Sequence, residues 1–470
     1  MTRAATLAAA AAHFDSGAFL RDLARRVAIR TESQQADSGP ALHAYLADEI
    51  APSLAALGFA CRLYPNPVPG AGPLLIARRV EDARLPTVLM YGHGDVVRGQ
   101  DKSWTRGAGP WVLQADGQRI YGRGTADNKG QHSINIAALA HVLAARGGLG
   151  GRLGFNLTWL FETSEETGSP GLADFCAAHQ AELAADVLIA SDGPRYRSDR
   201  ATVFLGSRGV ANFTLTLNLR AGAHHSGNWG GLLRNPGTVL AHAIACLVDS
   251  QGVILVQALR PPPVPDNVRA ALAGLQFGGD PGDPAVDADW GEPGLTPAER
   301  VIAWNTLEVL AMRTGNPDFP VNAIPASAQA HMHMRFVPGT DIAHLAEHVR
   351  AHLAAHGLAD VEVAAGEVMQ ATRLNPDSPW VRWCLASIER STGSPPVLLP
   401  NLGGSLPNDV FADILGLPTV WVPHSYAGCS QHAPDEHLLA PVAREALQIM
   451  AGLFWDLGDT TTPPPPCFAH

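Results

Sequence analysis

The chain has 470 residues, 46% of them hydrophobic, and carries a net charge of −11. This length exceeds what one compact core holds, so we expect two domains in an ordinary globular protein rather than a disordered one. The excess of 44 Asp+Glu over 33 Lys+Arg argues against a nucleic-acid partner, and no stretch is apolar and long enough to enter a membrane. Six cysteines are scattered singly, which is typical of a reduced, cytoplasmic protein and argues against thiolate zinc fingers.

Helical and strand patterns alternate along the first 200 residues. The Ala-rich start, 1–12, is too short and too weakly apolar for a secretion signal, and it continues directly into an amphipathic segment at 14–28. Helical patterns then cover 41–57 and 131–145, and short apolar strands are predicted at 74–76, 87–90, 153–161 and 187–190. This alternation predicts an α/β fold with a doubly wound, mostly parallel sheet covered on both faces.

The pattern changes near residue 201. Segments 203–205, 212–219 and 329–336 alternate apolar with polar residues, as half-exposed antiparallel strands do, and a helix is predicted over 342–356. Between them, the Pro/Gly/Asp-rich stretch 261–297 is interpreted as a long surface loop. Helices and strands return at 380–391, 419–422 and 441–457, and the proline-rich tail 460–470 is expected to be poorly ordered. We therefore predict a discontinuous domain, 1–201 with 371–470, and an inserted α+β domain, 202–370.

Five short polar clusters follow apolar or turn-forming segments and contain the residue types that bind divalent cations. Their candidate residues are His93 with Asp95, Asp127, the adjacent pair Glu165 and Glu166, Asp192, and His432. An Asp two residues after a His can accept the second imidazole N–H and so select the tautomer that binds metal. Any one cluster alone is more often a solvated or structural feature, but their joint order predicts a metal site.

In this combination the chain resembles the co-catalytic zinc family of aminoacylase, carnosinase, glutamate carboxypeptidase, acetylornithine deacetylase and succinyl-diaminopimelate desuccinylase. The resemblance covers essentially the whole chain and implies a catalytic metal-binding domain with an inserted lid and dimerisation domain. It implies the following metal ligands: His93 and Asp192 for one ion, Glu166 and His432 for the other, and Asp127 as the bridge. The ions would be two divalent cations per subunit, zinc first, with cobalt or manganese as substitutes.

The resemblance also implies a mechanism. Asp95 would orient His93, the peptide bond after Asp127 would be cis, and Glu165 would be the general base. Two bound cations would lower the pKa of a shared water and polarise the substrate carbonyl. Glu165 would take a proton from that water as it attacks and would pass the proton to the leaving nitrogen.

The inserted segment contains a motif at 223–231 that resembles the carnosinase-type His-Ser-Gly motif. In relatives the equivalent of His225 reaches into the partner subunit's site and stabilises the oxyanion, which implies a homodimer formed through the lid. A glycine-rich surface turn with a solvated His is the alternative. The preceding His224 departs from the family pattern, and its role is open.

A second group in the inserted segment resembles a clamp for the substrate carboxylate. Arg335 shares a strand face with His331 and His333, and it is joined in the resemblance by Asn322. A solvated Arg on an edge strand is the alternative. Gly404 and Ser405 resemble the Gly-Gly-Ser substrate loop, although an ordinary tight turn would look the same. His331, His333 and His424 have no assigned role, and Cys429, close to His432, is interpreted as a packing residue.

These observations predict a dinuclear metal-dependent hydrolase that cleaves the amide bond of a dipeptide or of a C-terminal amino acid. The alternative is a deacylase acting on N-acyl amino acids or related small amides, which needs the same metals and the same Arg335. The His-Ser-Gly and Gly-Gly-Ser motifs favour the dipeptidase-like branch. A binding or scaffold protein on this fold would have lost a metal ligand or the base, and none is missing.

Overall fold

The computed structural model describes residues 1–147, 151–278, 284–461 and 464–465, and it divides into two compact units. Unit 1 comprises Met1–Leu205, Leu374–Leu399 and Pro407–His470, whereas unit 2 comprises Gly206–Arg373 and Pro400–Leu406. Most of the tail predicted to be poorly ordered lies outside the described residues. Among the described helices, none combines the length and the hydropathy needed to cross a membrane.

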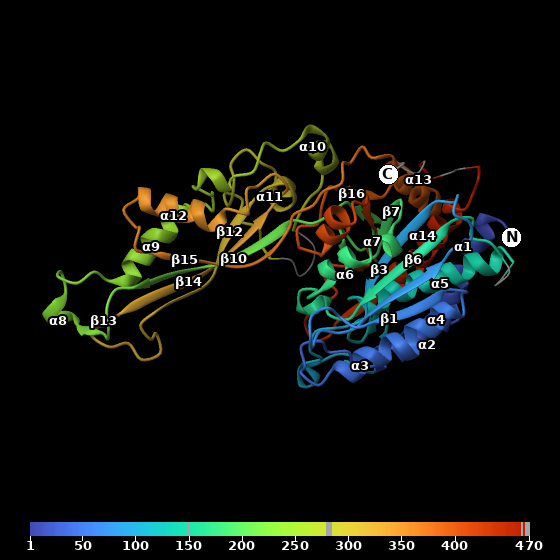
Figure 1. The fold of residues 1–470 in the computed structure, drawn as a ribbon, viewed down its shortest axis with the longest axis horizontal. Coiled ribbons are helices and arrows are strands. Elements are labelled where there is room, and N and C mark those ends of the chain that lie inside the picture. Colours follow the sequence, from blue (N-terminus) through green and yellow to red (C-terminus); the bar gives the residue numbers. More distant parts are fainter. Residues whose placement is uncertain (148–150, 279–283, 462–463, 466–470) are drawn as a thin grey trace. The chain divides into compact units, whose positions relative to one another are not determined.

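Unit 1 is built on an eight-stranded sheet with the strand order β1-β2-β6-β3-β7-β17-β9-β16 (Figure 1). In that order the strands span Ala60–Tyr64, Leu74–Arg79, Asn156–Glu162, Thr87–His93, Val187–Ala190, Thr419–Trp421, Thr202–Phe204 and Val397–Leu399. The central strands β6, β3, β7 and β17 run parallel, and antiparallel pairs occur only towards the two edges. The sheet is therefore mostly parallel, as the sequence predicts.

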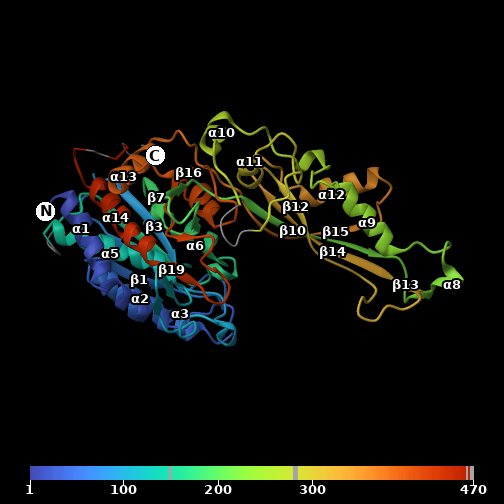
Figure 2. The same cartoon turned by 180° about the vertical axis from the view of Figure 1, so that it is seen from behind.

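Both faces of this sheet are covered. Successive residues of the central strands point to opposite sides, and both sets of side chains are buried. Val88 and Met90 of β3 join the main apolar core beneath one layer of helices. That layer contains α1 (Arg3–Asp15), α2 (Ala18–Ala28), α5 (Lys129–Ala145), α13 (Pro379–Thr392) and α14 (Ala440–Leu457) (Figure 2). On the other face Tyr91 packs against Phe411, at 5.0 Å between ring centroids. Phe411 lies in a π-helical turn that contacts α6 (Leu172–Ala178).

The N-terminal helical region is broken by a turn rather than continuous. The Ala-rich start forms α1, which packs on α14 and α5, and Gly17 separates it from α2 with a φ of 74°. Glycine adopts this left-handed conformation at little cost. The predicted helix 41–57 is likewise composite: α3 (Gly39–Ala44), a π-helical turn (Tyr45–Ile50) and α4 (Ala51–Ala55) follow one another. The shorter elements of unit 1 are β4 (Gln114–Asp116), β5 (Arg119–Tyr121), α7 (Gln180–Leu183), β8 (Pro194–Arg195), β18 (Ser425–Tyr426) and β19 (His437–Leu439).

Unit 2 contains a four-stranded antiparallel sheet with the order β12-β14-β10-β15. These strands span Thr306–Thr314, Ser327–Phe336, Gly209–Asn218 and Glu362–Met369. Alternate residues of β14, among them Met332 and Met334, are buried in a second core against α9 (Pro236–Leu247) and α12 (Leu345–Ala355). The short elements α8 (Ser226–Trp229), β11 (His224–His225) and β13 (Ala323–Ile324) lie together at one end of this unit (Figure 1).

Two parts of the chain differ from the sequence predictions. The stretch 261–297 is not simply a loop: it contains α10 (Asp266–Leu272), and Val268 and Leu272 pack with Ile302 of α11 (Pro297–Ile302). Residues 279–283 of this stretch lie outside the described residues. The segment Pro400–Leu406, placed by the sequence with the α/β domain, belongs to unit 2. The reason is backbone pairing with the start of that unit, since the Leu402 N–H donates to Gly206 O at 2.8 Å.

Candidate metal centre

The predicted ligands of unit 1 gather where parallel strands end. His93 is the last residue of β3, Glu165 and Glu166 follow β6, and Asp192 follows β7. Because β6, β3 and β7 are parallel neighbours, their carboxyl ends meet at one edge of the sheet, where open α/β folds bind ligands. Asp127 joins them from the turn before α5.

Two groups of side chains share the carboxylate of Asp127. In the first, His93 Nε2 lies 2.9 Å from Asp127 Oδ1 and 3.5 Å from Asp192 Oδ2. In the second, His432 Nε2 lies 2.9 Å from Asp127 Oδ2 and 3.0 Å from Glu166 Oε2. Within each group the donor atoms lie within 4.8 Å of one another. The peptide bond after Asp127 is cis. Each group therefore contains a different carboxylate oxygen of Asp127.

Among the described residues of this cluster, carboxylates outnumber cationic side chains. Four carboxylates, those of Asp127, Glu165, Glu166 and Asp192, surround only two imidazoles. Burial, with the charge of Asp127 added, raises the pKa of Glu166 to about 7 and that of Asp192 to about 6. Among the described residues, the buried Oδ2 of Asp192 has no hydrogen-bond partner. Buried carboxylates need a compensating charge, and imidazole with carboxylate is a donor set that divalent cations accept. The residues therefore fit divalent metal ions.

Glu165 stands beside the two groups rather than within them. Its Oε2 lies 3.9 Å from His93 Nε2, and its side chain is largely buried. Burial raises the pKa of Glu165 well above its usual range. A carboxyl group with a raised pKa at the edge of a polar site is suited to exchanging protons.

Asp95 does more than the sequence predicts. His93 Nδ1 lies 3.1 Å from the backbone O of Asp95 and 3.5 Å from its buried carboxylate, so both groups of Asp95 face the imidazole that it is expected to orient. The same carboxylate accepts the backbone N–H of Glu165 at 3.2 Å on one oxygen and that of Glu166 at 3.1 Å on the other. Asp95 thus ties the strand end that carries His93 to the turn that carries both glutamates.

Glu436 is an organising residue that the sequence analysis did not single out. Its buried carboxylate accepts the N–H groups of Gly124, Ala126 and Asp127 at 3.1, 2.9 and 3.2 Å. It also pairs with the buried Arg123 at 2.7 Å. These bonds hold the turn that presents Asp127. An acidic residue directly before the apolar strand β19 was the available signal.

The loop that carries His432 has an unusual backbone. Ser430, His432 and Asp435 have φ angles of 58°, 61° and 64°, in the left-handed region that costs a non-glycine residue about 1 kcal/mol or more. Asp435 anchors the loop by accepting the N–H groups of Thr105 and Arg106, both at 2.8 Å. These contacts offset the strain and hold His432 at the cluster.

Two nearby residues, His424 of open role and Cys429 with a predicted packing role, lie outside the ligand groups. His424 is buried, and its Nε2 lies 3.0 Å from Ser191 Oγ and 3.2 Å from Asn135 Oδ1. Burial lowers the pKa of His424 well below its usual value, so the ring is neutral. Burial also raises the pKa of Cys429 to about 12, which keeps this thiol protonated and agrees with a packing role.

Unit 2 brings Arg335 and Ser405 together. Arg335 Nη1 donates to Ser405 Oγ at 2.6 Å, and Ser405 Oγ in turn donates to Arg208 O at 2.6 Å. Among the described side chains, no carboxylate lies within ion-pair distance of Arg335, whose pKa burial lowers. Gly404 directly precedes Ser405 in the same segment. The guanidinium is therefore positioned and has no anionic partner among the described residues.

His225 and Asn322 form a separate group in unit 2. The Ser226 N–H donates to Asn322 O at 2.9 Å, and the exposed His225 accepts from Gly227 N at 3.1 Å through Nδ1. Asn322 lies just before β13, whereas Arg335 is near the end of β14. Along β14, Ser327 and Arg335 are separated by roughly 27 Å at about 3.4 Å per residue, and Asn322 precedes the start of that strand. Within the described residues no hydrogen bond joins Asn322 to Arg335, and the clamp formed by these two residues stays a prediction.

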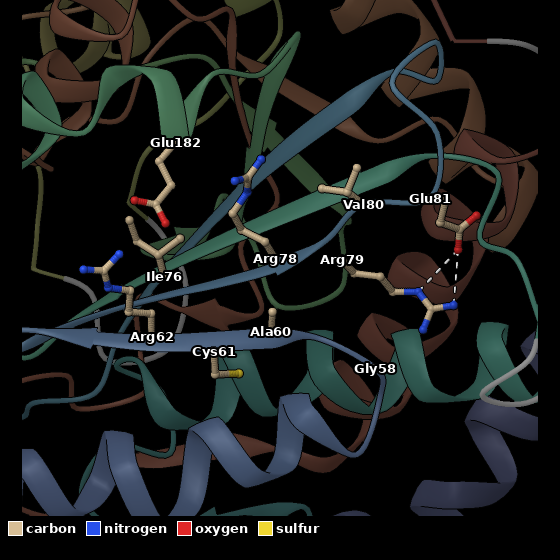
Figure 3. A pocket seen from close by; sticks show the side chains of 10 residues that line it. All are labelled: Gly58, Ala60, Cys61, Arg62, Ile76, Arg78, Arg79, Val80, Glu81 and Glu182. Carbon is tan, nitrogen blue, oxygen red and sulfur yellow. Dashed lines mark hydrogen bonds and ion pairs between the residues drawn. The ribbon is translucent and has the colours of Figure 1, made fainter.

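A cavity of about 610 Å³ in unit 1 contains none of the predicted site residues. It lies over β1 and β2, and its lining includes Arg62, Arg78, Arg79 and Glu182. Figure 3 shows Arg79 turned towards Glu81, while Arg62 and Glu182 lie around Ile76. This cavity has no histidine, and it is distinct from the metal centre.

Comparison with known proteins agrees with this geometry. Residues 89–456 match the model of peptidase family M20/M25/M40, and the chain belongs to this family. A Beta-Ala-His dipeptidase of Mus musculus is 31% identical over 196 residues, 41% of this chain. That match spans only 38% of the mouse protein. A Cysteinylglycine-S-conjugate dipeptidase of Corynebacterium striatum is 27% identical over 336 residues, 68% of this chain and 70% of that protein.

Solved structures share the fold. The M20 family metallo-carboxypeptidase Sso-CP2 of Sulfolobus solfataricus superposes with a TM-score of 0.79 at 23% identity. The alignment covers 93% of this chain and 98% of that protein. The α/β architecture with its inserted domain is thus the M20 fold.

Proposed function

We propose that this protein is a dinuclear metal-dependent hydrolase that cleaves the peptide bond of dipeptides or releases a C-terminal amino acid. The observation that carries the proposal is the pair of ligand groups sharing Asp127, with Glu165 beside them. Membership of the M20 family and the dipeptidase names of its relatives support it. Unit 1 is the catalytic domain in this proposal, and unit 2 is the lid.

Zinc is the proposed metal, with cobalt or manganese able to bind the same nitrogen and oxygen donors. His93, Asp127 and Asp192 would hold one cation, and Asp127, Glu166 and His432 the other. When bound, such cations polarise a carbonyl group and lower the pKa of water.

The protein's own groups handle the proton. Glu165 takes a proton from the attacking water and delivers it to the leaving nitrogen. Asp95 holds the backbone of Glu165, and the raised pKa of Glu165 lets its carboxyl group both accept and return a proton.

The substrate of this proposal carries a free carboxylate. Arg335, positioned by Ser405 and without an acidic partner among the described residues, binds that carboxylate through its planar fork of N–H donors. Gly404 leaves the backbone N–H groups of its loop accessible to the substrate. Dipeptides and N-acyl amino acids both satisfy this requirement, so the acyl side distinguishes the dipeptidase from the deacylase.

A substrate panel tests the function. We expect chelator-treated protein to be inactive and to recover with zinc, cobalt or manganese. Dipeptides with a free carboxylate should exceed their C-terminal amides by about 10- to 100-fold in kcat/KM, because the amide leaves the half-buried guanidinium unpaired. The Arg335→Gln variant is the control and should not distinguish acid from amide. N-acyl amino acids turning over faster than every dipeptide would establish the deacylase instead, and no metal-dependent amide hydrolysis would refute the proposal.

The active unit is proposed to be a homodimer formed through unit 2. His225 lies in the short β11–β13 pair and Asn322 directly before β13, whereas Arg335 lies near the end of β14, and a second copy would bring both groups to one substrate. The edge strand β12 also exposes Val309, Leu310 and Met312, apolar side chains that a partner would cover.

The proposed location is the cytoplasm. The cysteines of the described residues are free, which agrees with a reducing compartment.

Mixing two inactive variants tests this arrangement. A His225→Ala subunit lacks the donor for its partner's site, and a Glu165→Ala subunit lacks its own base. If His225 acts across subunits, each mixed dimer has one complete site, so exchange should restore about a quarter of wild-type activity. Either variant alone is the control. No recovery after verified subunit exchange, or full activity in a strict monomer, would contradict the proposal.

A further inference from the structure

A second group of metal-binding side chains lies in unit 2, apart from the dinuclear centre. It consists of Asp341, His344 and His348, whose donor atoms all lie within 4.8 Å of one another. His344 Nδ1 is 2.8 Å from Asp341 Oδ1, and His348 Nε2 is 2.9 Å from Asp341 Oδ2. Both imidazoles thus converge on one carboxylate, and the three residues share none of the roles described above.

The local fold explains this convergence. His344 is the N-cap residue of α12, and His348 lies one turn further on. Residues four apart occupy the same helix face, which is why two histidines at this spacing can chelate one ion. Asp341 precedes the helix, and its carboxylate directs one oxygen to each imidazole. The histidine rings lie 6.1 Å apart between centroids.

The same spacing continues along α12, but the later histidines are engaged differently. His352 Nε2 lies 2.8 Å from Cys246 O, and His356 Nδ1 lies 2.8 Å from His352 O. These contacts direct ring nitrogens to backbone carbonyls. Only the first histidine pair is joined to a carboxylate, and this difference singles out the start of the helix.

The cluster is accessible, and its present bonds are weak competitors for a cation. The side chains of Asp341, His344 and His348 are 49%, 56% and 27% exposed. Exposed ion pairs are weakened by solvent, so replacing them with metal bonds costs little. The helix N-terminus disfavours a cation, and the carboxylate of Asp341 offsets this effect. Glu347 adds a second negative charge that acts on His344.

We propose that Asp341, His344 and His348 form a mononuclear site for a divalent transition-metal ion on the lid. Two imidazole nitrogens and one carboxylate oxygen suit Zn²⁺, Ni²⁺ or Cu²⁺ better than Mg²⁺ or Ca²⁺, which prefer all-oxygen ligation. Because the group is exposed and supplies three ligands, water completes the coordination. The site is independent of catalysis and binds more weakly than the dinuclear centre.

The test uses the full-length enzyme with its dinuclear centre already loaded. Ni²⁺ is titrated calorimetrically, and bound metal is counted by elemental analysis. We expect one additional equivalent, with affinity reduced at least about tenfold in His344→Ala and in His348→Ala, since each loses one of three ligands. The matched control is His242→Ala, which removes an exposed histidine from α9 of the same unit and should retain the site.

A spectroscopic readout separates the site from adventitious binding. Cu²⁺ added to the loaded enzyme should give an electron paramagnetic resonance signal with two nitrogen ligands, and this signal should lose one nitrogen in either single variant. Peptidase activity should be unchanged in both variants. An extra equivalent that persists with equal affinity in the His344→Ala/His348→Ala protein, or no extra equivalent at all, would overturn the proposal.

Discussion

Replacing Glu165 with alanine is expected to lower kcat by about 10²- to 10⁴-fold while both divalent cations remain bound. The reason is positional: Glu165 lies 3.9 Å from His93 Nε2 and outside both ligand groups, so its loss removes a proton carrier and no metal donor. Turnover of a dipeptide and the metal content per chain are measured on the same preparation.

The neighbouring glutamate provides the control for that experiment. Glu166 belongs to the group with His432, so Glu166→Ala should lose one cation as well as activity. A Glu165→Ala protein that lost both metals together with turnover would refute this division of roles.

Replacing Asp127 with alanine is expected to have the largest effect, because one side chain serves both ligand groups. Its Oδ1 lies 2.9 Å from His93 Nε2 and its Oδ2 lies 2.9 Å from His432 Nε2. Both cations should be lost, and kcat/KM should fall on the order of 1,000-fold or more, since metal ions supply several kcal/mol of stabilisation. Elemental analysis and the same dipeptide assay measure the two effects.

Asp192→Ala is the comparison for the Asp127 variant. Asp192 belongs only to the group with His93, so this change should release one cation and leave the other. Equal metal loss in the two variants would show that Asp127 does not bridge. Retention of the fold in both proteins is checked by their thermal unfolding.

Chemistry that depends on short motifs could be predicted from the sequence. His93, the two glutamates and Asp192 each follow an apolar strand segment, and parallel strands place such positions at one edge of a sheet. Period-two alternation likewise predicted the shared face of His333 and Arg335 on β14. The resemblance to a known family supplied the roles of these residues, which no single motif carries.

Contacts between distant segments could not be predicted in this way. Glu436 is sequentially remote from the turn that presents Asp127, and its position before β19 does not identify that turn as its partner. The segment Pro400–Leu406 follows α/β elements in the chain and still joins unit 2, because its backbone pairs near Gly206.

The sequence by itself determined the class of fold and the residue types of the metal centre, because periodicity and motif spacing are local properties of the chain, and the family resemblance implied the candidate base. The tertiary structure alone decided how these groups are held. It showed that Asp95 secures both glutamate backbones, and that Arg335 is held by Ser405 from a distant segment. Such arrangements depend on strand register and loop conformation, which arise from packing between segments far apart in sequence.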